Sequence, residues 1–260
     1  MYLSAERLAL ANQAVRETFE QSSVAWQAIP HWETGDPSQT TVRQDNVTGP
    51  PGYLPLQTLP QPFSVTLAEA IAPTHDAVLA KVIANTAILA GKFDDIVIPA
   101  LHVAGMQTVG VGTATPPELL YSLIMARSMV EKGGYRAPSA GVTHVFGLIF
   151  LSQLVSGYSV YNSLLTPANV NSVYRVDTLE VAPLTPPTPV RGYMVGRRQR
   201  IAQGGAPAAS PGEEPVDIAV SVTPRLEVVG DTAANTIDLI VRVSFVTRVK
   251  DVGGLVAFIS

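Results

Sequence analysis

DAVLAKVIANTAILAGKFDDIVIPAL, residues 76–101, decides what kind of protein this sequence encodes. Two interpretations compete for its AGKFDD segment, a phosphate-binding loop and the end of a structural helix. A Walker loop has Ser or Thr after its lysine and follows a strand, but here Phe93 follows Lys92 and the preceding apolar residues have helical spacing. Gly91 before a lysine is typical of a helix C-terminus. We therefore predict a buried helix over residues 74–91 that ends at this glycine, and no nucleotide site.

The composition is unusually poor in charge. The chain has 260 residues, of which 47% are hydrophobic and 15% are charged, against about 25% charged in an ordinary soluble domain. Its best apolar run, residues 145–155, is interrupted by Ser152 and Gln153 and falls short of the ~20 residues that span a bilayer. We therefore expect contacts between protein subunits, and not a membrane, to cover the apolar surface.

Cysteine usage and net charge exclude further classes. The chain has no cysteine, so it has no disulfide, thiolate nucleophile or Cys-ligated metal. A formal net charge of −4 argues against nucleic-acid binding, for which basic proteins are typical. Glu6 and Arg7 stand where a signal peptide would carry its apolar core. The expected location is the cytoplasm.

Two further helices have clear sequence signals. Residues 4–20 have Ser4 as an N-cap and carry an apolar stripe at helical spacing. A helix beginning after Thr115 has a capping box with Glu118 and proline at its first position. It is predicted to end at the Lys-Gly-Gly of residues 132–134.

Between these helices, residues 30–62 contain seven prolines among Thr, Gln, Asp and Gly. Proline excludes a helix and confines strands to sheet edges or bulges. A structureless loop of this length is uncommon inside a compact domain. We predict an extended two-stranded arm that reaches onto a neighbouring subunit.

The remaining regular structure is predicted to be strand. Strands are expected over residues 142–151, 216–222, 225–229, 237–245 and 255–259. This order of elements lacks a regular βαβ repeat, so the fold class is α+β.

The candidate chemical groups do not form a recognisable catalytic set. The histidines are His31, His75, His102 and His144, and none has the spacing of a metal-ligand pair. Asp94 and Asp95 could be acid–base carboxylates but fit better in a solvated turn after the long helix. The one basic cluster comprises Arg191, Arg197, Arg198 and Arg200, for which ion pairing or a wet strand face is favoured over phosphate contact. We expect no catalytic residue, no metal and no cofactor, and hence no enzyme.

Three stretches together suggest a family. LPLQTLPQPFSVTLAEAI precedes the long helix, TPPELLYSLIMARSMVEKGGYRAPSAGVTHVFGLIF follows it, and TIDLIVRVSFVTRVKDVGGLVAFI closes the chain. In element order and length the chain resembles encapsulin shell proteins, which share the Hong Kong 97-type fold of tailed-phage major capsid proteins. AWQAIPHWETGDP and the Gly/Pro-rich residues 203–215 depart from the usual encapsulin pattern and leave the cargo type and subfamily open.

The resemblance implies a division of the chain into a peripheral domain, an extended loop and an axial domain. The divisions are 1–30 (N-terminal helix and start of the peripheral domain), 31–62 (extended loop), 63–136 (peripheral domain with the spine helix, 74–91), 137–216 (axial domain) and 217–260 (peripheral strands).

The resemblance also implies that the opening helix lines the interior of a shell and receives a short tail of a cargo protein. The residues that would form the cargo groove are Leu8, Val15, Phe19, Leu226 and Val228. The alternative is that the same side chains simply pack the peripheral domain.

The sequence leaves three functions open, and each can be tested. The first is a subunit of a closed icosahedral compartment that holds a cargo protein and has copies of itself as its main partner. The second is the major capsid protein of a tailed phage or prophage, located in the virion. The third is a small-molecule enzyme based on Asp94 and Asp95 or on His144. Subunit number, pore selectivity and cargo identity are not encoded in any motif of this sequence.

Overall fold

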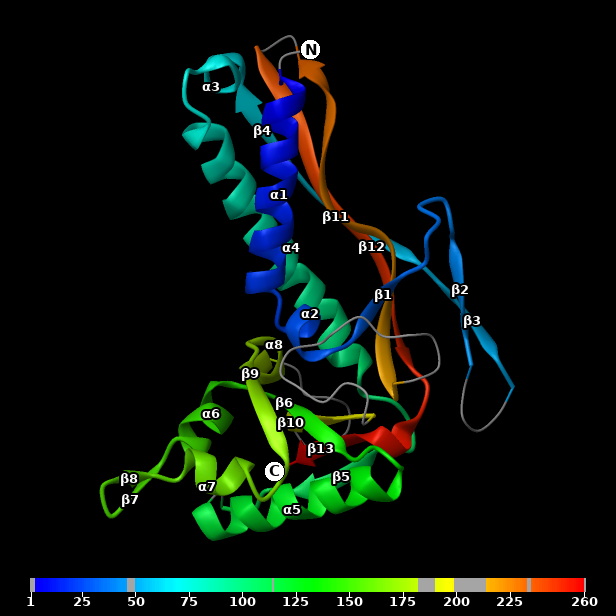
Figure 1. The fold of residues 1–260 in the computed structure, drawn as a ribbon, viewed down its shortest axis with the longest axis vertical. Coiled ribbons are helices and arrows are strands. Elements are labelled where there is room, and N and C mark those ends of the chain that lie inside the picture. Colours follow the sequence, from blue (N-terminus) through cyan, green and yellow to red (C-terminus); the bar gives the residue numbers. More distant parts are fainter. Residues whose placement is uncertain are drawn as a thin grey trace.

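The computed structural model describes residues 3–45, 50–113, 115–181, 190–198, 214–232 and 235–259. The molecule is elongated (Figure 1), with a four-stranded sheet and two long helices in its upper half, a five-stranded sheet with shorter helices below, and a β-arm projecting from one side.

The helices are α1 (Ala5–Ser22), α2 (Val24–Ala28), α3 (Leu67–Ile71), α4 (Asp76–Ala100), α5 (Pro116–Lys132), α6 (Val145–Leu151), α7 (Tyr161–Leu165) and α8 (Thr178–Val181), with a 3₁₀ turn at Val252–Gly254. The strands are β1 (His31–Glu33), β2 (Thr41–Gln44), β3 (Gly52–Pro55), β4 (Gln57–Thr66), β5 (Gln107–Gly110), β6 (Ala137–Thr143), β7 (Leu154–Val155), β8 (Tyr158–Ser159), β9 (Val170–Arg175), β10 (Val190–Arg197), β11 (Val216–Thr232), β12 (Thr236–Val249) and β13 (Leu255–Ile259).

The predicted N-terminal caps of helices α1 and α5 are confirmed. The Ser4 side chain accepts a hydrogen bond from the backbone N–H of Arg7 at the start of α1. Thr115 and Glu118 form the predicted capping box at the start of α5, with proline in the first turn.

The predicted end of the long helix is wrong. Helix α4 passes through Gly91 and Lys92 without interruption and continues to Ala100. Glycine inside a helix costs about 1 kcal/mol relative to alanine, but the next turns bury Phe93, Val97 and Ile98 completely. Burying each such side chain contributes about 1.5–3 kcal/mol. Packing therefore outweighs the local helix-stop signal.

The upper sheet has the strand order β1-β11-β12-β4 and is covered by α1 and α4 (Figure 1). Along β12 the side chains alternate as predicted, and the odd positions from Ile237 to Phe245 are buried against the helices. β11 is one strand and not two. The register of its pairing with β12 shifts between Val222 and Arg225. This irregularity accommodates Pro224, which has no N–H to donate, and the strand continues past it.

Strand β4 forms one edge of this sheet and carries two prolines. Pro62 lies opposite Ile240 and Pro60 opposite Arg242 in the antiparallel ladder with β12. An edge position is where a strand tolerates proline. The placement confirms the expectation that prolines here belong to an edge.

The predicted arm is present as a β2–β3 hairpin. Thr41 pairs with Pro55 and Gln44 with Gly52, and the hairpin projects away from the sheet in Figure 1. The rest of the predicted segment contributes to the body of the molecule, because β1 pairs with β11 and β4 pairs with β12.

The lower sheet has the strand order β5-β13-β10-β6-β9 and is packed by α5. Besides strands from within residues 137–216, it includes β5 and the C-terminal strand β13. The domain divisions stay predictions.

The prediction of a strand over residues 142–151 is wrong in part. Strand β6 ends at Thr143, and the apolar run Val145–Leu151 is the helix α6. A short apolar run does not distinguish a buried strand from a helix by periodicity. The deciding signal is His144, whose Nδ1 atom accepts a hydrogen bond from the Gly147 N–H at 2.8 Å and caps the helix.

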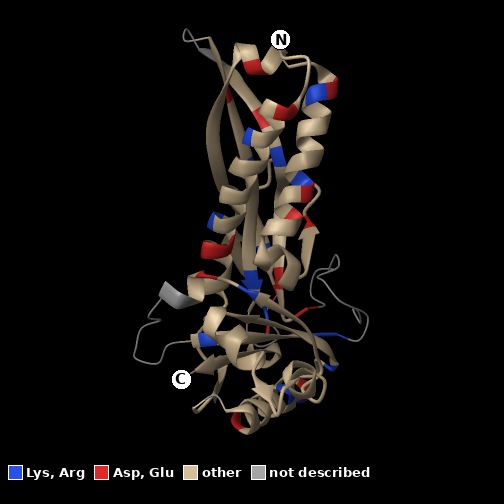
Figure 2. Cartoon of the chain, turned by 90° about the vertical axis from the view of Figure 1, so that its left-hand side faces the viewer, with Lys and Arg blue, Asp and Glu red and all other residues tan. Residues whose placement is uncertain are grey.

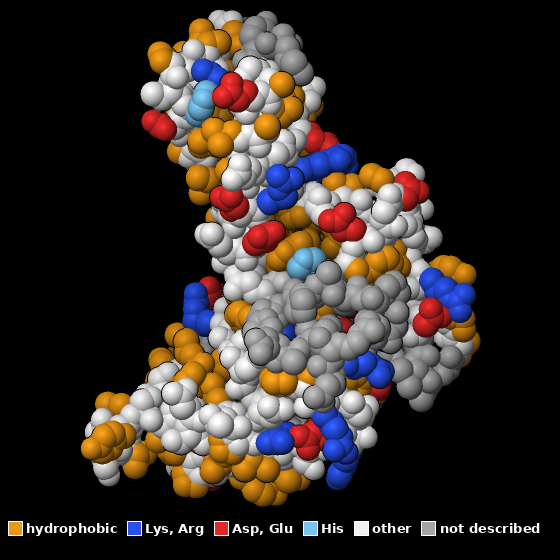
Figure 3. Space-filling view, viewed as in Figure 1, with side chains coloured by type: hydrophobic (Ala, Val, Ile, Leu, Met, Phe, Trp, Pro, Cys, Tyr) orange, Lys and Arg blue, Asp and Glu red, His pale blue; other side chains and the backbone are white. Residues whose placement is uncertain are grey.

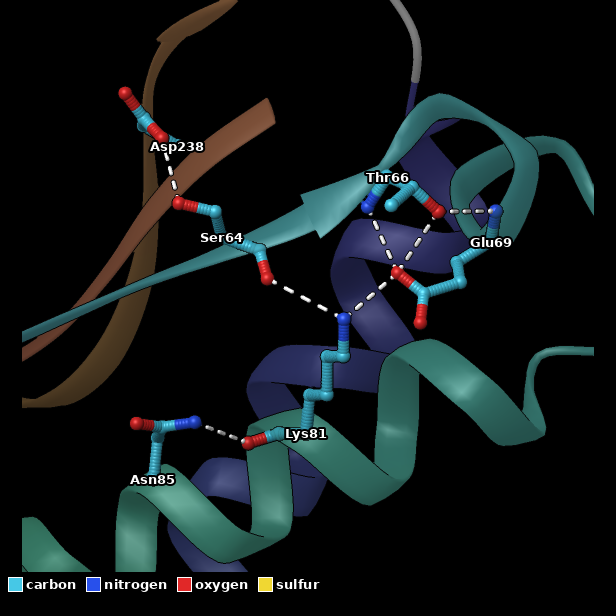
Figure 4. A network of polar contacts seen from close by, with 6 residues as sticks. All are labelled: Ser64, Thr66, Glu69, Lys81, Asn85 and Asp238. Carbon is cyan, nitrogen blue, oxygen red and sulfur yellow. Dashed lines mark hydrogen bonds and ion pairs between the residues drawn. The ribbon is translucent and has the colours of Figure 1, made fainter. Parts of the chain in front are cut away.

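A polar network ties the upper ends of α3, α4 and β4 together (Figure 4). The carboxylate of Glu69 accepts hydrogen bonds from the backbone and hydroxyl of Thr66 and from Nζ of Lys81, at 2.7–3.0 Å. These donors lower the pKa of Glu69 to about 2. Ser64 on β4 also donates to Asp238 on β12. The network fixes the connection between the edge strand and the long helix.

An aromatic cluster fills the core between α1, α2, α4 and β12. The Phe93 ring lies 5.2 Å from that of Phe19, 5.9 Å from that of Trp26 and 4.3 Å from that of Phe245, measured between ring centroids. All but Trp26 are fully buried, and Trp26 is nearly so. The cluster joins the two long helices to the sheet.

A buried ionic cluster lies at the lower end of the upper sheet. The Asp217 carboxylate accepts two hydrogen bonds from the Arg248 guanidinium, at 2.6 and 2.7 Å, and one from Nζ of Lys250 at 2.7 Å. Arg248 also lies over the Trp32 ring, 4.9 Å from its centroid, and donates to the backbone carbonyl of Arg43. The cluster therefore connects β11 and β12 to strand β2 of the β2–β3 arm.

Candidate assembly and cargo surfaces

Most of the side chains predicted to form a cargo groove are in the core. Val15 and Phe19 on α1 are fully buried, and Leu226 on β11 is 4% exposed. Leu8 is partly buried against the same core, and Val228 is exposed. The structure thus brings four of the five together between α1 and β11, where they pack the sheet. Cargo binding by this surface stays a prediction.

Asp94 is a structural acceptor, and not part of a solvated turn as predicted. Its carboxylate accepts hydrogen bonds from the Ser23 hydroxyl at 2.6 Å and from the backbone N–H groups of Val24 and Ala25 at 2.8 and 2.9 Å. It thereby caps the start of α2 from the middle of α4. The signal that could have located it is its helical spacing from Ala90 and Val97, which places it on the buried face of a longer helix.

Burial raises the pKa of Asp94 to about 6, although the hydrogen bonds from Ser23, Ala25 and Val24 oppose the shift. Because the folded-state pKa lies above the ordinary value of 3.8, the folded chain binds this proton more tightly than the unfolded chain does. Proton binding by this carboxyl therefore favours the folded state at low pH, and this effect is lost as the pH rises through about 6. At neutral pH the ionised carboxylate still accepts the three hydrogen bonds.

We expect Asp94→Ala to lower the free energy of unfolding by about 3 kcal/mol, because a buried donor that loses its acceptor costs about 1–3 kcal/mol and three donors lose theirs. Urea unfolding at neutral pH measures this. Asp95→Ala is the matched control, since Asp95 is exposed on the same turn of α4. An equal effect of the two variants would contradict the capping role.

The histidines do not converge on a site. His31 stacks on Trp26 with ring centroids 3.9 Å apart, and burial lowers its pKa. His75 precedes α4, His102 follows it, and His144 caps α6. Across the part of the chain that the structure describes, no group of three or more His, Cys, Asp or Glu side chains could hold a metal ion.

The predicted basic cluster is divided between different environments. Arg197 is fully buried and donates to the backbone carbonyl of Ala28 at 2.9 Å, so it joins β10 to α2 and does not lie on a wet strand face. The guanidinium of Arg198 lies 5.2 Å from the centre of the Tyr135 ring. Arg191 lines a cavity of the lower half, and Arg200 lies outside the described residues.

Charged residues are sparse, and both signs are interspersed along the ribbon in Figure 2. Large apolar side chains are exposed instead. They include Tyr53 on the arm, Ile83 and Ile88 on α4, Tyr121 and Ile124 on α5, Phe146, Ile149 and Phe150 on α6, and Leu154, Val155 and Tyr158 on the β7–β8 hairpin. An isolated soluble subunit rarely exposes so much apolar surface.

A cavity of about 450 Å³ opens in the lower half between the five-stranded sheet and helices α5, α6 and α7. Its sheet side includes Gly141 and Gly192 on neighbouring strands. At Gly192 the carbonyl oxygen of Val142 lies 2.6 Å from where a Cβ would stand, so the position has no room for a side chain. Phe146 and Phe150 of α6 line it from the opposite side. The lining is mostly apolar and holds no pair of acid–base groups.

No helix within the described ranges is both long and apolar enough to cross a membrane.

Comparison with known proteins gives a clear result for the fold. No model of a known protein family matches the chain, and no curated protein matches its sequence. Among solved structures, a virus-like particle from Pyrococcus furiosus is similar, with a TM-score of 0.70 and 12% identity over 98% of this chain and 100% of that one.

Two further structures show the same fold. A phage-related protein from Bordetella bronchiseptica matches with a TM-score of 0.65 and 10% identity over 96% of each chain. An encapsulin from Synechococcus elongatus matches with a TM-score of 0.58 and 12% identity, over 89% of this chain and 84% of that one. The chain therefore has the Hong Kong 97-type capsid fold, which confirms the predicted α+β class and architecture.

Proposed function

We propose that this chain is a structural shell subunit that self-assembles into a closed icosahedral protein compartment enclosing a cargo protein, as encapsulins do. The observation that carries the proposal is the match of nearly the whole chain to solved shell proteins, 98% of it in the case of the virus-like particle. A subunit of this kind performs no catalysis.

The surface of the subunit supports the same proposal. Its exposed apolar residues are spread over the arm, α4, α5 and the lower helices, so a subunit with several neighbours would cover them on several sides. Each such contact is individually modest, but contacts made simultaneously reinforce one another and stabilise a closed assembly. The projecting β2–β3 arm would reach a neighbouring copy.

A cargo tail would bind on the interior surface beside α1 and β11. Leu8 and Val228 are the two predicted groove residues with accessible side chains. Val15, Phe19 and Leu226 would support this surface from beneath. The compartment would lie in the cytoplasm of a bacterium or archaeon.

The second candidate is the major capsid protein of a tailed phage or prophage, and a specific observation favours it. Several of the similar solved structures are phage capsids, including those of a cyanophage and of the Myoviridae phage XM1. In this case the particle would hold nucleic acid, and its location would be the virion.

The purified full-length chain should form closed particles of megadalton mass, visible by negative-stain electron microscopy and measurable by light scattering. Nuclease-resistant nucleic acid inside the particles would identify a capsid, and a co-purifying protein would identify a compartment. A monomer, or a small discrete oligomer with no large species, would overturn both candidates and favour an enzyme or another function.

A surface variant makes this test sharper. Tyr53→Ser removes an exposed aromatic side chain from the arm and should raise the protein concentration needed for assembly without changing the unfolding of the subunit. Thr41→Ser, an exposed polar position on the same arm, is the matched control and should assemble normally.

A further inference from the structure

We infer that the β7–β8 hairpin of one subunit inserts its apolar tip into the cavity between the five-stranded sheet and α6 of a second copy of the chain. The inference rests on the proposed shell function and specifies one of its contacts. The occupant is a second copy because the same molecule carries both the projection and a hollow that suits it.

The projection is short and is closed by a tight turn. Leu154 pairs with Ser159 and Val155 with Tyr158 across a two-residue turn. Ser156 and Gly157 both have positive φ, at 53° and 82°, which defines a type I′ turn, the tightest common connection in a hairpin. Such a turn holds the side chains of both strands in a fixed arrangement.

Most of the apolar side-chain surface of this hairpin is exposed in the isolated subunit. Leu154 is 68% exposed and Tyr158 is 79% exposed, and in Figure 3 the apolar end of the lower half stands clear of the body. A two-stranded hairpin is at best marginally stable without a packed face. A covering surface is therefore expected, and the β7–β8 hairpin projects from the lower half of the molecule (Figure 1).

The cavity has the properties of such a covering surface. Its volume of about 450 Å³ lies within the ~300–1,000 Å³ typical of ligand pockets, so it has room for one or two apolar side chains. Of the described residues that line it, Arg191 alone carries a full charge. The hairpin segment, residues 153–159, carries none. Insertion therefore buries apolar surface without the cost of removing paired charges from water.

The geometry also favours an assembly that closes. The hairpin and the cavity are different surfaces of one subunit, so their contact is heterologous, and repeated heterologous contacts close into a ring when the rotation allows. The hairpin directly follows α6, which lines the cavity. In a ring, each subunit would therefore insert its hairpin into one neighbour and accept the hairpin of the other neighbour in its own cavity.

The absence of cysteine from the chain permits a direct test by disulfide crosslinking. A full-length double variant carries Tyr158→Cys at the hairpin tip and Phe146→Cys at the cavity, both at exposed positions. Oxidised particles should give a ladder of covalent dimers and larger species on a denaturing gel, and reduction should return them to monomer. Co-assembled single variants should give dimers only, when the two are mixed.

Two controls separate this contact from general proximity. Tyr158→Cys combined with Val229→Cys, which is also at an exposed position but on β11, should give no ladder. Adding Gly141→Leu to the crosslinking pair should abolish the ladder by filling the cavity. A Cβ at Gly141 meets Val173 at 3.4 Å, an ordinary contact, and an unchanged urea unfolding midpoint of this triple variant would show that the larger leucine leaves the fold intact.

Each outcome decides the inference. Particles without a ladder, dimers formed by Tyr158→Cys alone, or a small molecule retained in the cavity by native mass spectrometry would each overturn it while leaving the shell function intact. If the unmodified chain forms no particles, the proposed function fails, and this inference fails with it.

Discussion

Asp217→Ala should lower the free energy of unfolding by about 4 kcal/mol, close to the loss expected when one partner of a buried ion pair is removed. Asp217 is fully buried, and its two partners, Arg248 and Lys250, are 3% and 5% exposed. Removing the carboxylate leaves two cations in the protein interior without the acceptor of three of their hydrogen bonds. Urea unfolding at a fixed protein concentration measures the effect.

The expected loss comes mainly from the charges that remain. A pair of opposite charges in the interior contributes little net stability compared with apolar residues of the same size, whereas an unpaired buried charge is costly. Arg248 retains its position over the Trp32 ring and its hydrogen bond to the Arg43 carbonyl, but these contacts do not neutralise it. The folded chain must admit water or shift its backbone.

Asp45→Ala is the matched control. Asp45 also accepts a hydrogen bond from an arginine, Arg43, at 2.6 Å, but both side chains are more than half exposed. Exposed ion pairs contribute about 0–1 kcal/mol. If the two variants lose the same stability, burial is not what makes the Asp217 cluster important.

Phe93→Ala should lower the free energy of unfolding by about 4 kcal/mol, within the range for truncating a fully buried phenylalanine. Phe93 contacts aromatic rings from α1, α2 and β12. Truncation therefore removes apolar burial and leaves a cavity at the point where both long helices meet the sheet. The neighbouring rings are held by separate elements and cannot all move in to fill it.

Tyr121→Ala is the control for this prediction, because Tyr121 on α5 is 65% exposed in the subunit. Its removal should change the unfolding of the subunit by less than about 0.5 kcal/mol. A small effect of Phe93→Ala, below about 1 kcal/mol, would mean that the core collapses around the truncated side chain, contrary to this account.

Local signals in the sequence were sufficient to predict an element where the capping residues and the pattern of buried residues indicated the same element. Ser4, Thr115 and Glu118 located the starts of α1 and α5. Strict alternation located β12, because one face of that strand is buried and the other is not. The projecting hairpin followed from prolines, which act on the backbone directly.

The errors arose where contacts distant in sequence overrode a local preference. Gly91 and Lys92 are a good helix stop in isolation, but α1, α2 and β12 provide apolar partners for the turns that follow. Asp94 was misplaced for the same reason, since its donors lie about 70 residues earlier. The cavity and its two glycines depend on strand pairing between β6 and β10, which no local pattern encodes.

The prolines of β4 oppose the addition of further strands to the edge of the upper sheet. Pro60 and Pro62 lack a backbone N–H, and they occupy an edge of the upper sheet. An exposed sheet edge with an unbroken row of backbone N–H donors can pair with further chains and so start a fibril. On this edge the two prolines each remove one of those donors. A concentrated solution of these molecules is thus biased away from amyloid-like polymerisation, which leaves contacts through side chains as the route to multimers.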